Sequence, residues 1–314
     1  MFVKVFVLHK GVSLLEYFSE NAWVYNLYVA IIAGLTSMLF WGAGDFVAAV
    51  LSRRIGHIRT LLWTTIFGDL VVITYALITG ALSDFTLTAF FFALAGGLLH
   101  TIGTLSFYKG LREGKVSLVA PISSGWSLIL VLAGVLLYGE VLTATQISAV
   151  VFVIIGSILV SADFRELFTS SKVRFSDPGI PYAFITLFSW GIGLLLFNEA
   201  VKQVSWIIPN IILASSIIFF LVVYSVSSKQ SLSPPVSKND WLRAIFIGFA
   251  AIAAYISYSI GIEKYPTSLV GPLAAACPLV TVVLASLILR EKTAFNQKLG
   301  MLSVIAGAIL LSVK

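Results

Sequence analysis

Charged side chains are scarce in this sequence. Asp, Glu, Lys and Arg make up 11% of its 314 residues, whereas soluble globular proteins carry about a quarter. Apolar residues reach 59%. This balance excludes a separate soluble domain, a nucleotide-binding cassette and an extended nucleic-acid surface. We therefore expect a chain embedded in lipid, whose formal net charge of +6 lies on its loops.

Residues that bind metals or form disulfides are equally few. A single cysteine cannot form an intramolecular disulfide, and three scattered histidines without cysteine partners do not make a recognisable structural metal site. The sequence also lacks the Gly-x-Ser-x-Gly, His-Glu-x-x-His and P-loop motifs of common enzyme classes. We expect neither a metal site nor catalytic residues.

Long apolar runs are what the sequence does contain. Many have about the 20 residues that a helix needs to cross a hydrocarbon core of about 30 Å. Helices are favoured over a barrel because the runs are continuous and do not alternate with polar residues. The sequence therefore predicts an all-α integral membrane protein with ten transmembrane helices. The expected ranges are 26–50, 59–81, 86–108, 116–138, 144–162, 180–201, 206–227, 241–262, 267–289 and 295–313.

The first 25 residues do not fit this pattern. Lys4, Lys10, Glu16 and Glu20 interrupt their apolar run, and no small-residue cleavage site follows, so a signal peptide is not expected. Two interpretations of residues 1–25 stay open, an interfacial helix and a mis-assigned start codon.

Lys and Arg concentrate on alternate loops. The five odd-numbered loops carry three each, which together make fifteen of the twenty in the chain. The even-numbered loops carry only Lys202 and Lys264. By the positive-inside rule, the odd-numbered loops face the cytoplasm and both termini face outward.

The sequence contains an internal repeat. Residues 107–161 align without gaps to residues 258–312, with 16 of 55 positions identical. The matches include Pro, Glu, Gln and Gly, which apolar composition alone does not explain. Trp-Gly pairs at Trp41 and Trp190 extend the repeat upstream, so each half holds five helices.

An odd number of helices places the two copies of a repeat in opposite orientations. We therefore predict two inverted five-helix repeats, 26–162 and 180–314, which follow an N-terminal extension, 1–25, and are joined by a loop, 163–179. Inverted repeats allow one half to rock against the other around a site near the bilayer midplane. This geometry serves alternating-access transport.

These features resemble the EamA-type members of the drug/metabolite transporter superfamily. The resemblance covers roughly 26–313. It rests on the ten helices in two halves, the Trp-Gly pairs, the Pro near the start of each fourth helix, and the Glu, Gln and Gly that follow. It implies a multi-pass secondary transporter without a cofactor, whose cavity is lined by the first, third and fourth helices of each half. Such proteins usually place both termini inside, opposite to what the loop charges favour here.

Two ionisable residues deep in the spans are candidates for substrate binding or proton coupling. Asp45 and His100 are costly in lipid unless they face water or a partner, and their repeat mates are apolar or small. Asp45 stands four residues after Trp41, so both side chains lie on one helix face. Asp69 also lies inside a span, but on an outer helix, where we expect it to pair with a neighbouring helix.

Aromatic residues supply the other cavity candidates. Trp41 and Trp190, each followed by glycine, either line the cavity beside a close helix crossing or anchor the chain at the membrane interface. Amphipathic rings on cavity-lining helices add four more candidates. These are Tyr108, Trp126, Tyr255 and Tyr258.

Several repeated or polar residues are expected to shape the scaffold. Pro121 and Pro272 each remove a helical hydrogen bond, so they are hinge candidates or tolerated kinks. Glu140 and Glu291 are expected to bind backbone amides at the start of the helix that follows them. Asn198, near Lys202, is expected at a hydrated interface.

The sequence therefore predicts a secondary transporter for a small amino acid-like or amphiphilic metabolite. Export across the cell membrane is expected, with proton coupling left open. Two alternatives remain. One is a flippase for lipids or lipid-linked sugars, and the other is an intramembrane aspartyl protease, because Gly42 to Asp45 resembles the motif of that class and Asp69 could be the second carboxylate. The recurrence of Trp-Gly-x-Gly without Asp weighs against the protease.

The expected partners are a small-molecule substrate and the lipid bilayer, with no nucleic acid, and a homodimer stays open.

Overall fold

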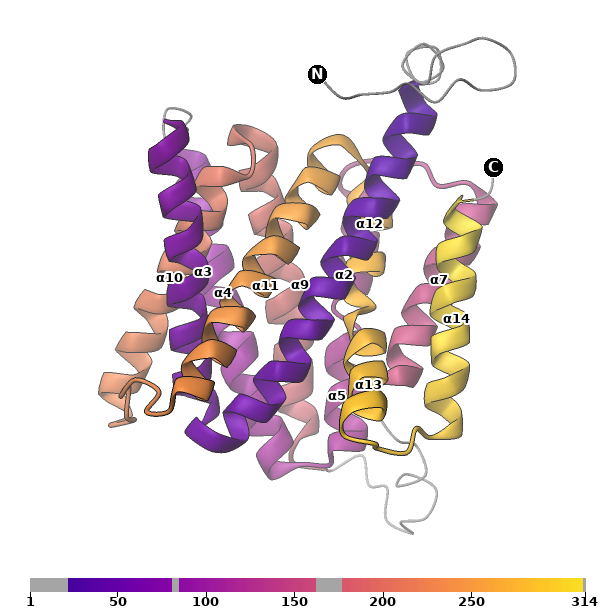
Figure 1. Cartoon of the computed structure of the whole chain (residues 1–314). Helices are drawn as coiled ribbons and strands as arrows, with labels where there is room; N and C mark the ends of the chain where they lie inside the picture. The colour runs from indigo at the N-terminus through magenta and orange to yellow at the C-terminus, as the bar shows by residue number, and fades with distance from the viewer. Residues whose placement is uncertain (1–21, 81–84, 162–176, 313–314) are drawn as a thin grey trace, which may run out of the picture.

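A computed structural model describes residues 22–80, 85–161 and 177–312, and within them the chain forms helices and no strands (Figure 1). The expected N-terminal extension lies almost wholly outside the described residues, as does most of the loop expected at 163–179. The helices of the first half are α2 (Ala22–Ile55), α3 (His57–Thr79), α4 (Leu87–Glu113), α5 (Val116–Ser124), α6 (Ser127–Leu136) and α7 (Ala144–Val160). Those of the second half are α9 (Ile180–Val204), α10 (Ile207–Ser227), α11 (Lys238–Lys264), α12 (Thr267–Ala275), α13 (Cys277–Ile288) and α14 (Phe295–Ser312).

Eight helical spans are long and apolar enough to cross a membrane, and α7 and α14 are shorter apolar helices. All ten expected ranges fall on helices. The fourth and ninth, however, are each split into two helices, α5 with α6 and α12 with α13, where the sequence predicted continuous spans.

The two splits lie four residues after the hinge candidates. Pro121 lies inside α5 and Pro272 inside α12, and neither ends its helix at its own position. At the first split, hydrogen bonds span three residues in place of four, as between the Gly125 amide and the Ile122 carbonyl. At the second split, Pro278 lies in the first turn of α13, and a proline has no amide to continue the hydrogen bonds of α12.

The two faces of the bundle carry different loops. One side, at the top of Figure 1, holds the start of α2, the end of α14 and the connections of the even-numbered loops, and we call it the neutral side. The described residues of these connections include Gly80, Tyr138 to Glu140, Ser205 and Tyr265. The basic side, at the bottom, holds the turn at Gly56 and the α10–α11 and α13–α14 connections. These connections are among the odd-numbered loops, which carry most of the Lys and Arg.

Helices of the first half pack against helices of the second half in reciprocal pairs. The third helix of the first half, α4, packs on the first helix of the second half, α9, and in the same way α11 packs on α2. The last helices of the two halves, α7 and α14, pack on each other. Glycines allow these approaches, since a Cβ at Gly156 would lie 2.7 Å from the Gly300 carbonyl oxygen, and the reverse distance is the same. Such close packing of small residues is what associates helices in lipid.

Candidate functional site

The glycine of each Trp-Gly pair forms a close helix crossing between the halves. A Cβ at Gly42 would lie 2.5 Å from the Cys277 carbonyl oxygen, and one at Gly191 would lie 2.9 Å from the Trp126 carbonyl oxygen. Cys277 and Trp126 lie at the two splits, at equivalent positions of the repeat. Each glycine therefore brings the first helix of one half onto the split helix of the other half.

Asp45 lies one turn beyond Gly42 and faces the start of α13. The Cys277 thiol donates to its carboxylate with Sγ and Oδ2 3.7 Å apart. The Thr281 hydroxyl, one turn further along α13, donates to the Gly42 carbonyl at 2.9 Å and holds α13 against α2. Although it is in the middle of the bundle, the Asp45 side chain is exposed. This combination suits a carboxylate that receives a ligand.

Aromatic rings from three helices lie together one helical turn from Asp45. Trp41 on α2 meets Tyr255 of α11 edge-on, with ring centroids 5.1 Å apart. Phe197 of α9 meets Tyr255 in the same way at 5.6 Å. The rings of Trp41 and Tyr255 are only half-buried, so their free surfaces can contact a ligand.

His100 joins this group through two contacts. The Tyr255 hydroxyl and His100 Nδ1 are 3.5 Å apart, a long hydrogen bond in which either group can donate. The His100 ring also stacks on Trp190, whose Nε1 donates to Thr104 at 3.2 Å. We group these residues with Asp45, one turn along α2, and its partner Cys277, and call them the midmembrane cluster. Its members are Trp41, Asp45, His100, Trp190, Tyr255 and Cys277.

The other three sequence candidates have different surroundings from one another. Tyr108 stacks on His57 with centroids 4.6 Å apart, towards the basic side, and is close enough to Asp45 to interact with it electrostatically. Trp126 lies at the split between α5 and α6. Tyr258 lies against the midmembrane cluster, with its ring centroid 5.8 Å from that of Trp41. It is fully buried and accepts a hydrogen bond from Asn198, so it packs helices together and has no free surface for a ligand. The expectation that Asn198 lies at a hydrated interface is wrong, because its side chain is fully buried.

Asp69 is separate from the midmembrane cluster. It is 5% exposed and accepts a hydrogen bond from Ser215 of α10 at 2.8 Å, which is the interhelical contact expected for it. Asp45 and Asp69 thus have different partners on different helices. Among the described residues, no three His, Cys, Asp or Glu side chains lie close enough to hold a metal ion.

Glu140 does bind backbone amides at a helix start, but at a different helix from the one expected. Its two carboxylate oxygens accept from the amides of Thr267 at 2.9 Å and Ser268 at 3.1 Å, the first residues of α12. Thr143 and Gln146 cap the following helix, α7, with a capping box of their own, so it does not need Glu140. Glu291 in the second half is exposed.

Tyr138 adds a second tie on the neutral side. Its hydroxyl donates to Glu199 of α9, and Lys202 lies 3.8 Å above its ring centroid. Burial, together with the Glu199 carboxylate, raises the pKa of Tyr138 above its usual range. The hydroxyl therefore stays protonated and continues to donate.

The two sides of the bundle are packed differently. On the neutral side α12 packs on α6 and α7, and α9 packs on α11. Among the described elements, the equivalent pairs on the basic side, such as α5 with α13 and α2 with α4, show no comparable packing. Every residue of α12 is buried, whereas no residue of α13 is. The bundle is therefore closed on the neutral side and looser on the basic side.

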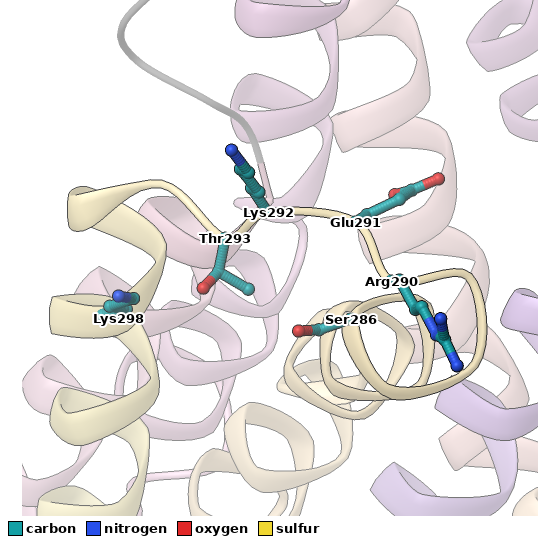
Figure 2. Close-up of a pocket in the computed structure, with 6 residues that line it drawn as sticks. All are labelled: Ser286, Arg290, Glu291, Lys292, Thr293 and Lys298. Atoms are coloured by element: carbon teal, nitrogen blue, oxygen red, sulfur yellow. The ribbon is translucent and has the colours of Figure 1, made fainter.

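A cavity of about 460 Å³ opens on the basic side, between the end of α13 and the start of α14 (Figure 2). Its lining residues are Ser286, Arg290, Glu291, Lys292, Thr293 and Lys298. This cavity lies at the bundle end and does not include the midmembrane cluster.

Sequence reasoning missed Cys277 and Thr281. The single cysteine drew attention only for the disulfide that it cannot form. Two features of the sequence could have indicated its role. Cys277 precedes Pro278, and it is the repeat mate of Trp126, which is consistent with the start of a half-helix within the membrane.

Known proteins resemble this chain in sequence and in fold. An uncharacterized transporter of Archaeoglobus fulgidus is 20% identical over 287 residues, which cover 90% of this chain and 97% of the relative. An uncharacterized protein of Methanocaldococcus jannaschii is 29% identical over 143 residues, 42% of this chain and 96% of the relative. A protein of known crystal structure, 17% identical, superposes with a TM-score of 0.74 and covers 90% of this chain and 98% of its own.

A family model gives the assignment. The EamA-like transporter family matches residues 28–162 and again residues 177–313, so the match covers both halves of the chain. The chain belongs to the EamA-like transporter family and is a multi-pass membrane protein of the drug/metabolite transporter type.

Proposed function

We propose that the protein is a secondary transporter that moves a small metabolite by alternating access between two inverted five-helix repeats. One observation carries the proposal: an exposed carboxylate, Asp45, lies in the middle of a bundle that is closed on one side and loose on the other. A loose side gives a solute a route to the midmembrane cluster, and a rocking motion of the halves would exchange the two sides.

The chemistry of the midmembrane cluster favours an amino acid-like or amphiphilic solute. Asp45 can pair with an ammonium group, and the rings of Trp41 and Tyr255 can bind an apolar body or a cation. A carboxylate with a thiol as its side-chain donor is also suited to exchange a proton during the cycle. We therefore propose proton coupling through Asp45.

We propose export across the cell membrane as the direction. If the positive-inside rule holds for this chain, the basic side faces the cytoplasm, and the observed arrangement loads solute from the cell interior.

Transport by the purified protein in liposomes tests this proposal. Labelled amino acids and amphiphilic amines would be screened with and without a pH gradient, against liposomes without protein. Gradient-dependent movement of a solute supports the proposal. Movement of labelled lipid between leaflets without any solute transport would replace it with the flippase alternative.

A further inference from the structure

Glu140 ties the two halves together at the neutral side. Its carboxylate accepts from the Thr267 and Ser268 amides, which lie 127 and 128 residues further along the chain. The first amides of a helix have no partner within the helix, and the helix dipole favours negative charge there. A carboxylate with two such bonds therefore holds the start of α12 firmly.

Two glycines beside this contact make room for the Glu140 carboxylate. Gly134 lies directly beneath the carboxylate, so that a Cβ at this position would collide with the Glu140 side chain and lie 3.0 Å from the Ser268 Cβ. Gly139 supplies the positive φ, 63°, of the turn that brings Glu140 back over α6. Both glycines let the carboxylate reach α12 across the interface.

The equivalent residue of the second half lacks this contact. Glu291 sits in the same turn, with its amide bonded to the Ala285 carbonyl as the Glu140 amide is bonded to the Gly134 carbonyl. Its side chain lines the basic-side cavity (Figure 2), and no hydrogen bond or ion pair joins its carboxylate to the part of the chain that the structure describes. Ala285 also places a methyl group where the first half has Gly134.

We propose that Glu140 is a one-sided latch: its carboxylate holds α12 against α6, and the neutral side opens only when Glu140 releases the α12 amides. Glu291 has no latch function. The proposal rests on the alternating-access mechanism above and makes Glu140 a positioning residue for the transport cycle, remote from the solute.

Thiol accessibility measures the latch without any substrate. Leu130 of α6 is fully buried and touches α12 at Gly271, so a cysteine at this position reports opening of the neutral side. Leu130→Cys would be made in a Cys277→Ser background and labelled with an impermeant maleimide in vesicles. Cysteines at Val141 on the neutral side and Val236 on the basic side, which are 94% and 92% exposed, would show which side of the protein faces out of the vesicle.

We expect Glu140→Gln to raise the labelling rate about tenfold from the neutral side, a change that corresponds to about 1.4 kcal/mol. Glu291→Gln is the matched control and is expected to leave the rate unchanged. An unchanged rate in Glu140→Gln, or an equal rise in Glu291→Gln, would overturn the one-sided latch.

Thr267→Pro provides a second variant in case Glu140→Gln does not fold. It deletes one of the two amides that Glu140 accepts from, at the first position of α12, where proline is tolerated. Pro266 before it has φ −53° and ψ 124°, which a following proline permits. A rise in labelling from the neutral side is expected here too, and its absence would contradict the proposal. Because labelling needs no solute, a negative transport assay with a positive labelling result would refute the transport proposal alone.

Discussion

Asp45 occupies a position where lipid would make a carboxylate costly, yet it has one weak donor, the Cys277 thiol, and an exposed side chain. Asp69, also in the middle of a span, is buried and bonded to a hydroxyl of the neighbouring helix. The two carboxylates thus differ in surroundings although the sequence presents them alike. The exposed one is free to change its partner or its charge in the transport cycle that we propose.

Replacing these carboxylates one at a time separates their roles. Asp45→Asn is expected to lower gradient-driven transport at least about tenfold, a change equivalent to about 1.4 kcal/mol, because the amide cannot carry the proton. Asp69→Asn, the matched control, is expected to keep its gradient dependence. Initial rates in liposomes at matched protein content, with and without the gradient, give the result, and unchanged coupling in Asp45→Asn would remove Asp45 from the mechanism.

Gly42 and Gly44 lie two residues apart on α2 but meet different surroundings. A Cβ at Gly42 would lie 2.5 Å from both the Cys277 carbonyl oxygen and the Val280 Cβ, whereas one at Gly44 would make an ordinary contact of 3.5 Å with Ala250. Gly42→Ala is expected to destabilise the fold by about 1–3 kcal/mol, and Gly44→Ala to leave it nearly unchanged. Thermal unfolding in detergent compares them, and equal stability would show that the crossing of α2 and α13 is not tight.

The split helices are the elements that bring the halves into contact near the middle of the membrane. Pro278 deprives α13 of an amide at its start, and the break aims Cys277 at Asp45. The first half has Ser127 at the equivalent position and splits with a tight turn at Gly125. The same repeat position therefore produces a break by different chemistry in each half.

Pro278→Ala tests whether the second break matters for transport. Alanine restores the missing amide, so α12 and α13 can continue into one another and draw Cys277 away from Asp45. We expect slower transport with undiminished thermal stability, while Ser127→Ala, the matched change in α6, keeps the normal rate. A Pro278→Ala protein that transports at the normal rate would show that the break is dispensable.

The ranges of the helices were predictable from the sequence, because lipid demands continuous apolar runs and charge marks their ends. The splits were not, since Pro121 and Pro272 suggested bends at their own positions, whereas the helices break four residues later. The contact between Glu140 and the start of α12 could not be predicted either. Its helical partner is more than a hundred residues away, and local sequence shows only a turn.

The candidate site was recognised in part. Asp45, His100, Trp41 and Trp190 stood out as polar or repeated residues inside spans, and the structure brings them together through Tyr255. Cys277 did not stand out, because its importance comes from the break beside it. Burial of Tyr258 depends on tertiary packing that composition and spacing do not report.

At the scale of the whole molecule, the loose side of the bundle is also the side with the basic loops. If the basic side is cytoplasmic, a cysteine at Val236 is expected to react with an impermeant maleimide only in inside-out vesicles, and one at Val141 only in right-side-out vesicles. Both positions are strongly exposed. The reverse pattern would overturn the proposed orientation and make the observed arrangement open to the outside.

The pair formed by α7 and α14 has a consequence for the surrounding lipid. These helices have 17 and 18 residues, so at 1.5 Å per residue they extend only about 26–27 Å, less than a hydrocarbon core of about 30 Å. They lie together along one edge of the bundle (Figure 1). The bilayer must thin locally along this edge or the flanking residues must stretch to reach its surface. In the proposed mechanism, the thickness of the host membrane therefore influences how easily the halves move.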